Sequence, residues 1–177
     1  KGLGRELSPR LEYAWRFSGL GEVGPSTHFA RSGRNPVQVL DFGCGRGEMV
    51  VQAMLHGADV IGIDYSAEAV RMARKAVESQ KLKFKSPTRN YFDNFRGKQN
   101  FKSKAKIGRT EILLVNGKKL PFKDGQVGLV FFLDVAEHLY PEELVEILGE
   151  IRRVMKPGGR LIIHTAPNKL WPDGGYK

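Results

Sequence analysis

Two aspartates and a run of glycines have the types and the spacing of a nucleoside-binding site. The segment D-F-G-C-G-R-G at residues 41–47 follows an apolar run, and Asp64 ends a second apolar run 21 positions after Gly43. Glycines adopt backbone angles that side chains forbid, and they let a ligand approach the main chain where the next helix begins. An acid at the end of the following strand can accept hydrogen bonds from a ribose diol. The pattern therefore predicts a strand, turn, helix and strand that together hold a nucleoside.

The charges around the turn indicate what kind of nucleoside this is. Dinucleotide sites usually carry G-x-G-x-x-G, but here Gly47 comes one residue early and Glu48 occupies the third glycine position. Asp41 places a negative charge before the turn, where it would repel a pyrophosphate and attract an ammonium group. The expected ligand is cationic at one end. S-adenosylmethionine fits, because it has an amino group, a sulfonium and no phosphate.

Five segments in order resemble the class I S-adenosylmethionine-dependent methyltransferases of the methyltransferase type 11 kind. They are D-x-G-C-G-x-G at 41–47, I-D-Y-S at 63–66, L-P-F at 120–122, A-E-H-L at 136–139 and R-V-M-K-P-G-G at 153–159. The resemblance implies a Rossmann-like, doubly wound α/β fold with a mostly parallel sheet of strand order 3-2-1-4-5. It also implies methyl transfer from S-adenosylmethionine to oxygen, nitrogen or carbon of a small metabolite or a glycan or lipid precursor.

The turn and the resemblance together name the candidate site residues. His138 is the candidate catalytic base, because an imidazole with a pKa of about 6.5 can accept a proton from a hydroxyl or an amine. Its alternative role is a structural Glu-His pair that caps the next turn, and Tyr65 either lies against the adenine or packs in the core. Cys44 is expected to be a small residue in a tight turn rather than a nucleophile. The expected cofactor contacts are Asp41, Gly43, Cys44, Gly45, Asp64, Tyr65, Asn116, Gly117 and Asp134.

A second hypothesis comes from the same stretch of chain. Asp134, Glu137 and His138 form a cluster similar to the metal-binding segment of small-RNA 3′-terminal ribose methyltransferases, in which a divalent ion orients the terminal hydroxyls. Asp134 replaces the Glu of that family, and its further histidine ligand is not found before Lys177. A metal-assisted RNA ribose 2′-O-methyltransferase therefore stays an alternative, and no metal ligand is assigned.

Alternating patterns predict the elements that position these residues. The pattern predicts strands at 37–42, 59–64, 111–115, 127–133 and 160–165, and helices at 47–56, 67–79 and 142–155. Residues 7–20 are expected to form an amphipathic helix, within a helical lead-in that spans 1–36. The family usually continues with a further helix and two strands after the point where this chain stops. That ending, together with Gly128 where relatives commonly have Asp, leaves a non-catalytic cofactor-binding domain as another alternative.

Composition sets limits on the class of protein. The 177 residues, 41% of them apolar, suit a single domain over 1–177 with a substantial core. No stretch approaches the roughly 20 apolar residues that span a bilayer, so no membrane span is expected. Cys44 is the sole cysteine and cannot form an internal disulfide, which fits a cytoplasmic location.

Most of the net charge of +10 falls in one segment, the basic insertion at 81–110. Ten Lys and Arg residues and one acid lie between Lys81 and Arg109, with five aromatic residues among them. Basic side chains interleaved with aromatics can bind single-stranded nucleic acid. The other interpretations are a solvated surface insertion, and a basic lid over a phosphorylated or acidic small substrate.

Overall fold

The computed structural model describes residues 7–20, 31–32, 35–36, 38–85 and 107–165, and the account below is confined to them. In chain order the elements are α1 (Pro9–Ser18), β1 (Arg31–Ser32), β2 (Asn35–Pro36), β3 (Gln38–Phe42), α2 (Glu48–Leu55), β4 (Asp59–Asp64), α3 (Ala67–Lys85), β5 (Thr110–Leu114), β6 (Val127–Leu133), the short 3₁₀ helix η1 (Ala136–His138), α4 (Pro141–Val154) and β7 (Met155–His164).

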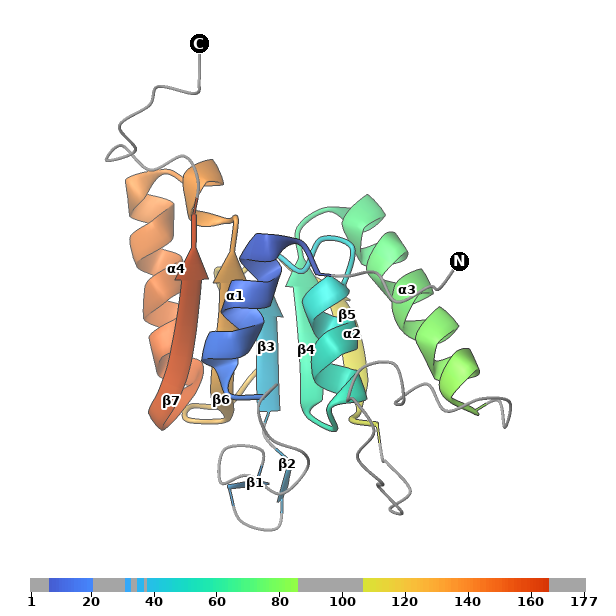
Figure 1. Cartoon of the computed structure of the whole chain (residues 1–177). Coiled ribbons are helices and arrows are strands. Elements are labelled where there is room, and N and C mark those ends of the chain that lie inside the picture. The colour runs from blue at the N-terminus through green and yellow to red at the C-terminus, as the bar shows by residue number, and fades with distance from the viewer. Residues whose placement is uncertain (1–6, 21–30, 33–34, 37, 86–106, 166–177) are drawn as a thin grey trace.

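The main sheet has five strands in the order β5-β4-β3-β6-β7, and every neighbouring pair is parallel. This confirms the predicted order 3-2-1-4-5. The strands point the same way in Figure 1, so their carboxyl ends meet at one edge of the sheet. In open parallel sheets this edge is where ligands bind, next to the strand at which the order reverses. β1 and β2 form a separate two-stranded antiparallel pair, so the predicted helical lead-in over 1–36 is wrong at its end.

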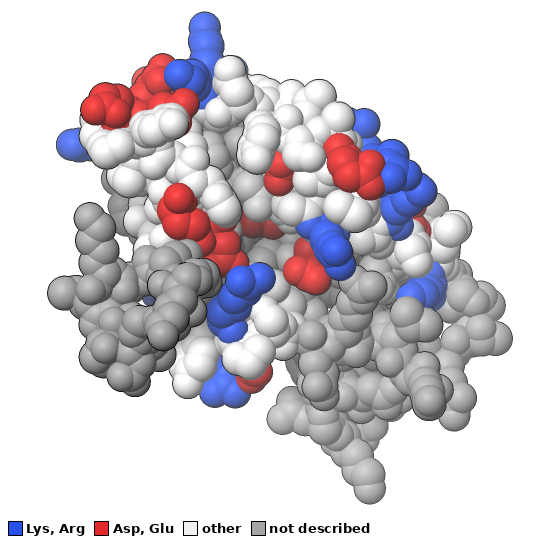
Figure 2. Space-filling model, turned by 90° about the horizontal axis from the view of Figure 1, so that it is seen from above, with Lys and Arg blue, Asp and Glu red and all other residues white. Residues whose placement is uncertain are grey.

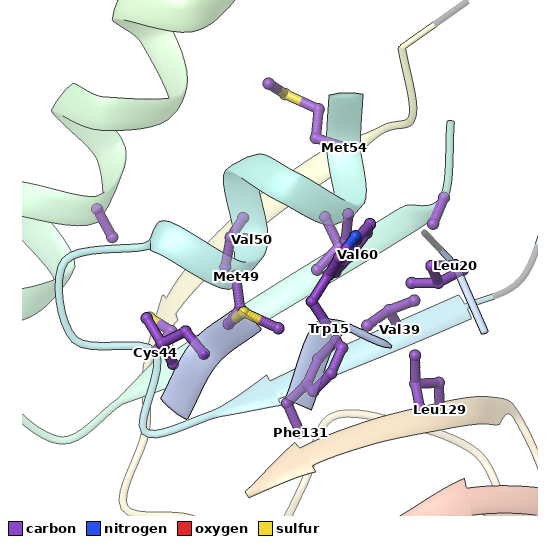
Figure 3. Packing of buried hydrophobic residues seen from close by; sticks show 14 of the residues in the cluster. Trp15, Leu20, Val39, Cys44, Met49, Val50, Met54, Val60, Leu129 and Phe131 are labelled. Carbon is purple, nitrogen blue, oxygen red and sulfur yellow. The ribbon is translucent and has the colours of Figure 1, made fainter. Parts of the chain in front are cut away.

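Side chains alternate along the central strands and build two apolar layers, as buried parallel strands require. Val39 and Leu129 face the layer that contains α1, α2 and α3, while Leu40 and Val130 face the layer that contains α4. Figure 1 shows α1 and α2 in front of the sheet. Figure 3 shows labelled side chains of the first layer meeting between these helices and the strands.

Helix α1 confirms the predicted amphipathic helix with shorter bounds. It starts at Pro9, a residue suited to a first helical position, and stops at Gly19, whose φ of 72° is left-handed. Its buried face includes Trp15, whose ring lies 4.6 Å from the ring of His56 at the end of α2. The packing fixes α1 across the sheet against β7.

The predicted basic insertion begins too early, because its first residues belong to helix α3. Helix α3 continues to Lys85 instead of ending at residue 79, because no glycine or proline interrupts it. At the other end, Arg109 donates two side-chain hydrogen bonds, at 2.9 and 2.6 Å, to the buried carboxylate of Asp59. That arginine therefore anchors β5 beside β4. The rest of the insertion, residues 86–106, lies outside the described residues.

The last strand begins earlier than the pattern predicted. Val127 pairs with Met155 and Leu129 pairs with Arg160, so the intervening residues of β7 bulge out of register. Regular pairing starts at Arg160, which is where the sequence predicts the strand. In the part of the chain that the structure describes, no helix has the length and apolar character needed to cross a membrane.

Candidate functional site

A pocket of about 760 Å³ opens at the carboxyl edge of the sheet. Its wall is formed by the loops that follow β3, β4, β5 and β6, with contributions from α1 and α4. Figure 2 looks onto this end of the molecule and shows acidic side chains around a hollow near its middle. The charged groups in the wall are the carboxylates of Asp41, Glu48, Asp64, Asp134 and Glu143 and the cations of Arg10, Arg46 and Lys118.

The glycine turn between β3 and α2 forms the floor of this pocket. Gly43, Gly45 and Gly47 have φ of 71°, 51° and 78°, which side-chain-bearing residues rarely adopt. A Cβ on Gly43 would lie 2.4 Å from a methyl group of Val135, so this position has no room for a side chain. A Cβ on Gly45 would meet nothing within 4 Å, because that residue faces the open pocket. The turn therefore exposes main chain to a ligand.

Asp64 ends β4 and ties the turn to its neighbouring strand. Its Oδ2 accepts a hydrogen bond from the backbone N–H of Gly45 at 3.0 Å, and its Oδ1 accepts one from the backbone N–H of Ser66 at 2.8 Å. The side chain is buried yet lines the pocket. Each carboxylate oxygen has two acceptor sites, so capacity remains for hydroxyl donors of a ligand.

Asp41 is a buried acid at the bottom of the pocket. Burial, and then the charges of Asp64 and Glu48, raise its pKa to about 7, while the backbone N–H of Val50 acts in the opposite direction. A carboxylate that is costly to ionise in the apo protein is stabilised when a cation binds beside it. This environment fits the ammonium group of an amino-acid tail.

Cys44 lies within the turn and is buried. Burial raises the pKa of its thiol, and the charges of Asp41 and Asp64 raise it further. A thiol that stays protonated is a poor nucleophile. The structure therefore agrees with the expectation that Cys44 is a small residue in a tight turn.

Three further predicted residues follow β4 and β5. Tyr65 is 82% exposed at the pocket rim, so its interpretation as a core aromatic is wrong. Asn116 also lines the pocket, and its Oδ1 accepts a hydrogen bond from the backbone N–H of Lys118 at 3.1 Å, which leaves the amide NH₂ to donate. Gly117 is not one of the residues that line the pocket, and a Cβ there would lie 2.2 Å from the ring of Phe42.

Asp134 follows β6 and is the only non-glycine residue with a positive φ, 56°, in the described part of the chain. Its Oδ2 lies 2.8 Å from a guanidinium nitrogen of Arg10, and its Oδ1 lies 2.6 Å from Nδ1 of His164. Its backbone N–H also donates to the carbonyl of His164 at 2.9 Å. Asp134 therefore joins α1, β6 and β7 at the edge of the pocket.

His138 lies at the end of η1, exposed and in the pocket wall. The carboxylate of the preceding Glu137 accepts a hydrogen bond from the hydroxyl of Thr165 at 3.0 Å. Among the residues that the structure describes, no three His, Cys, Asp or Glu side chains gather into a group that could hold a metal ion. Since Asp134 and Glu137 have other partners, the metal-assisted hypothesis gains no support.

Sequence reasoning missed Arg10 and did not identify the partner of His164. Arg10 lies on a predicted helix, but nothing in the local sequence says that this helix brings it into the pocket. His164 lies on β7, at the edge of the sheet, and its Nδ1 lies 2.6 Å from Oδ1 of the pocket residue Asp134. Asp134 has Arg10 and His164 as its partners only because the fold brings α1, β6 and β7 together, and the local sequence does not show this.

Comparisons with known proteins agree with this geometry. Residues 40–163, well over half of the chain, match the methyltransferase domain family. An uncharacterized methyltransferase of Synechocystis sp. is 28% identical over 141 residues, which are 76% of this chain and 51% of that protein. A demethylmenaquinone methyltransferase of Lactiplantibacillus plantarum is 30% identical over 127 residues, which are 70% of this chain and 43% of that protein.

A solved structure has the same fold. The PH0226 protein from Pyrococcus horikoshii OT3 superposes with a TM-score of 0.55 and 26% identity, over 75% of this chain and 50% of that chain. The chain thus spans about half the length of the proteins it matches. With its parallel sheet, glycine turn and ordered motifs, the chain belongs to the methyltransferase domain family, in the class that uses S-adenosylmethionine.

Proposed function

We propose that this chain transfers the methyl group of S-adenosylmethionine to a small organic acceptor. One observation carries the proposal: the buried carboxylates of Asp41, near the end of β3, and Asp64, at the end of the adjacent β4, lie on either side of a glycine turn that opens into the pocket. This arrangement suits a ligand with a cationic tail and a ribose. The excess of carboxylates over cations in the pocket wall favours the positively charged donor as well.

Each end of the donor has a partner in this proposal. Asp41 would bind the ammonium group, and Asp64 would accept hydrogen bonds from the ribose hydroxyls. Tyr65 would lie against the adenine, and the amide NH₂ of Asn116 would donate to its edge. Gly43 and Gly45 would let the donor lie directly on the main chain. The bound donor supplies an electrophilic methyl group on its sulfonium.

The protein's own contribution is to position the acceptor and to exclude water. Leu133, Val135 and Leu139 provide an apolar wall beside His138. In the transfer, the bond between sulfur and methyl breaks with its electron pair left on sulfur, and a bond from methyl to the acceptor forms. An imidazole nitrogen of His138 would take the proton that the acceptor loses. In-line positioning supplies much of the acceleration.

The small size of the acceptor is inferred from the pocket. The whole pocket, which must hold the donor as well as the acceptor, falls within the range of about 300 to 1,000 Å³ that small-molecule sites span, and apolar side chains make up much of its wall. The relative from L. plantarum is named for a quinone-type acceptor, which is consistent with an apolar substrate. No feature of the described residues favours nucleic acid as the acceptor.

Calorimetry tests the proposed donor. We expect S-adenosylmethionine and S-adenosylhomocysteine to bind and NAD not to bind. Asp41→Asn should weaken binding of S-adenosylmethionine by about 10-fold or more, because it removes a charge-assisted contact. Asp124→Asn is the matched control, since Asp124 is exposed and pairs with Arg153 outside the pocket. If the wild type binds neither S-adenosylmethionine nor S-adenosylhomocysteine, the proposal is wrong.

Activity is tested with a radiolabelled methyl donor and pools of small metabolites. Once an acceptor is found, His138→Ala should lower the turnover rate by about 10²-fold or more while changing the Kd of the donor less than twofold. An unchanged turnover rate would show that another group, or water, takes the proton.

A further inference from the structure

We infer that Arg10 of α1 binds the carboxylate of the donor's methionine tail and makes the pocket selective for a donor that has this carboxylate. The inference rests on the proposed function, because it assigns a partner to the part of the donor that Asp41 and Asp64 leave unbound. It concerns a residue outside the five sequence motifs.

The fold brings Arg10 to the pocket from a distant part of the chain. Leu11, Ala14 and Trp15 are buried on one face of α1 and fix this helix against the sheet. Arg10, at the start of the helix, is thereby placed in the pocket wall beside Leu11. The Arg10 side chain remains 56% exposed, so it has freedom to adjust to a ligand.

The ion pair with Asp134 occupies only some of the N–H donors of the Arg10 guanidinium. One Arg10 nitrogen lies 2.8 Å from Asp134 Oδ2. His164 holds the other oxygen of Asp134 at 2.6 Å, so the carboxylate is fixed independently of Arg10. A guanidinium has five N–H donors in a planar fork that matches a carboxylate. In the described part of the chain no other acceptor within hydrogen-bond distance of Arg10 is found, and donors therefore remain for a ligand.

The position of this pair suits the tail of the donor. Asp134 follows β6, which is hydrogen-bonded to β3, the strand that carries Asp41. Val135, the next residue, packs so closely on Gly43 that a Cβ there would overlap it. Arg10 therefore lies on the side of the glycine turn where β3 and β6 end. The ammonium and the carboxylate of an amino acid share one carbon atom, so a group that binds the carboxylate must act close to Asp41.

The other two cations of the pocket wall fit this role less well. Lys118 pairs with Glu146 at 3.2 Å and follows β5, on the side of Asn116 and the proposed adenine. Arg46 is exposed within the glycine turn and is the real competitor. The test must therefore include both arginines.

The decisive experiment measures how each of two donors binds to the wild type and to each arginine variant. The Kd values of S-adenosylmethionine and of decarboxylated S-adenosylmethionine, which keeps the amine, the sulfonium and the nucleoside, are measured by calorimetry. The proteins are the wild type, Arg10→Gln and Arg46→Gln. Arg16→Gln is the control, because Arg16 lies on the same helix, 68% exposed, and pairs with Glu12 away from the pocket.

We expect Arg10→Gln to weaken binding of S-adenosylmethionine by about 10- to 100-fold, the usual effect of losing a hydrogen bond between charged groups. The decarboxylated donor should bind to the wild type and to Arg10→Gln with the same Kd within about twofold. Arg16→Gln and Arg46→Gln should leave the preference for the carboxylate unchanged. Arg10→Lys should keep part of it, because a lysine retains the charge without the fork.

Other outcomes would overturn the inference. If Arg10→Gln weakened the binding of both donors equally, the residue would only hold α1 in place. The Tm of the ligand-free variant would then be lower than that of the wild type. A loss confined to Arg46→Gln would assign the carboxylate to that residue instead. If the wild type binds S-adenosylmethionine but Arg10→Gln changes neither Kd, the inference alone fails. If the wild type binds neither donor, the proposed function fails with it.

Discussion

The carboxylate of Asp64 holds the backbone of Gly45, 19 residues earlier in the chain, through a hydrogen bond of 3.0 Å. The end of β4 thus fixes the glycine turn that follows β3, and both lie at the floor of the pocket. A residue that the sequence suggests as a ribose ligand also orders the loop on which the ligand would lie. We therefore propose that binding and folding are linked at this position.

Asp64→Asn tests that link. An amide has one acceptor oxygen where the carboxylate has two, so Gly45 or Ser66 loses the partner of its backbone N–H. We expect the free energy of unfolding to fall by about 1 to 3 kcal/mol and the donor to bind about 10-fold more weakly. Urea unfolding and calorimetry measure the two effects. A loss of affinity at unchanged stability would show that Asp64 acts on the ligand alone.

Asp41 makes the stability of the ligand-free protein depend on pH. In the folded protein its pKa is raised to about 7, mainly by burial, whereas in the unfolded chain it is near 4. Between these values the folded state holds more protons, so the cost of burying Asp41 grows as pH rises from about 4 to about 7. Asp41→Asn removes this cost. The variant should exceed the wild type in free energy of unfolding by a few kcal/mol at pH 8, at about 1.4 kcal/mol per unit of pKa, and by much less at pH 4.

The same carboxyl predicts proton release when the donor binds. A cationic group beside Asp41 favours its carboxylate, so binding at pH 6 should expel close to one proton, and binding at pH 8 should expel few. Calorimetry in two buffers with different heats of ionisation counts these protons. Asp41→Asn should bind without the pH-dependent release. Equal release by the variant and the wild type would place the titrating group elsewhere.

The sequence was sufficient to predict the strands and their order in the sheet, but not the contacts between distant segments. Strands such as Val127–Leu133 were predicted correctly because their apolar runs and the turns around them are local signals. The contact of Arg10 with Asp134 joins residues 124 positions apart, and its geometry depends on how α1 packs against β7. A charge count places Arg109 in the basic segment, but it does not show that this exposed side chain pairs with the buried Asp59.

Two glycines provide a matched test of the packing. Gly108 passes so close to β4 that a Cβ would lie 1.7 Å from the carbonyl oxygen of Ala58, while Gly149 on α4 has open space around it. Gly108→Ala should lower the free energy of unfolding by several kcal/mol, because two backbone segments must move apart. Gly149→Ala should raise it by about 1 kcal/mol, because alanine is the better helix former. Thermal and urea unfolding measure both, and a mild effect at Gly108 would contradict the close approach.

Glu150 stabilises the loop before β6 in a way that acid should abolish. Its carboxylate accepts hydrogen bonds from Arg153 at 2.7 and 2.8 Å and from the backbone N–H of Leu120 at 2.9 Å, and Arg153 holds its pKa at about 2. Because the pKa is lowered, the folded protein gains stability at any pH above the ordinary pKa of Glu, near 4.5. This added stability is lost as pH falls from about 4.5 toward 2. We expect Glu150→Gln to lower the free energy of unfolding by about 1 to 2 kcal/mol at pH 7, after allowance for solvent screening, and by clearly less at pH 3.

Glu146→Gln is the control, because it breaks an exposed pair with Lys118. It should change the free energy of unfolding by less than about 0.5 kcal/mol at either pH. A pH-independent cost at Glu150 would mean that the packing of this side chain, rather than its charge, supports the loop.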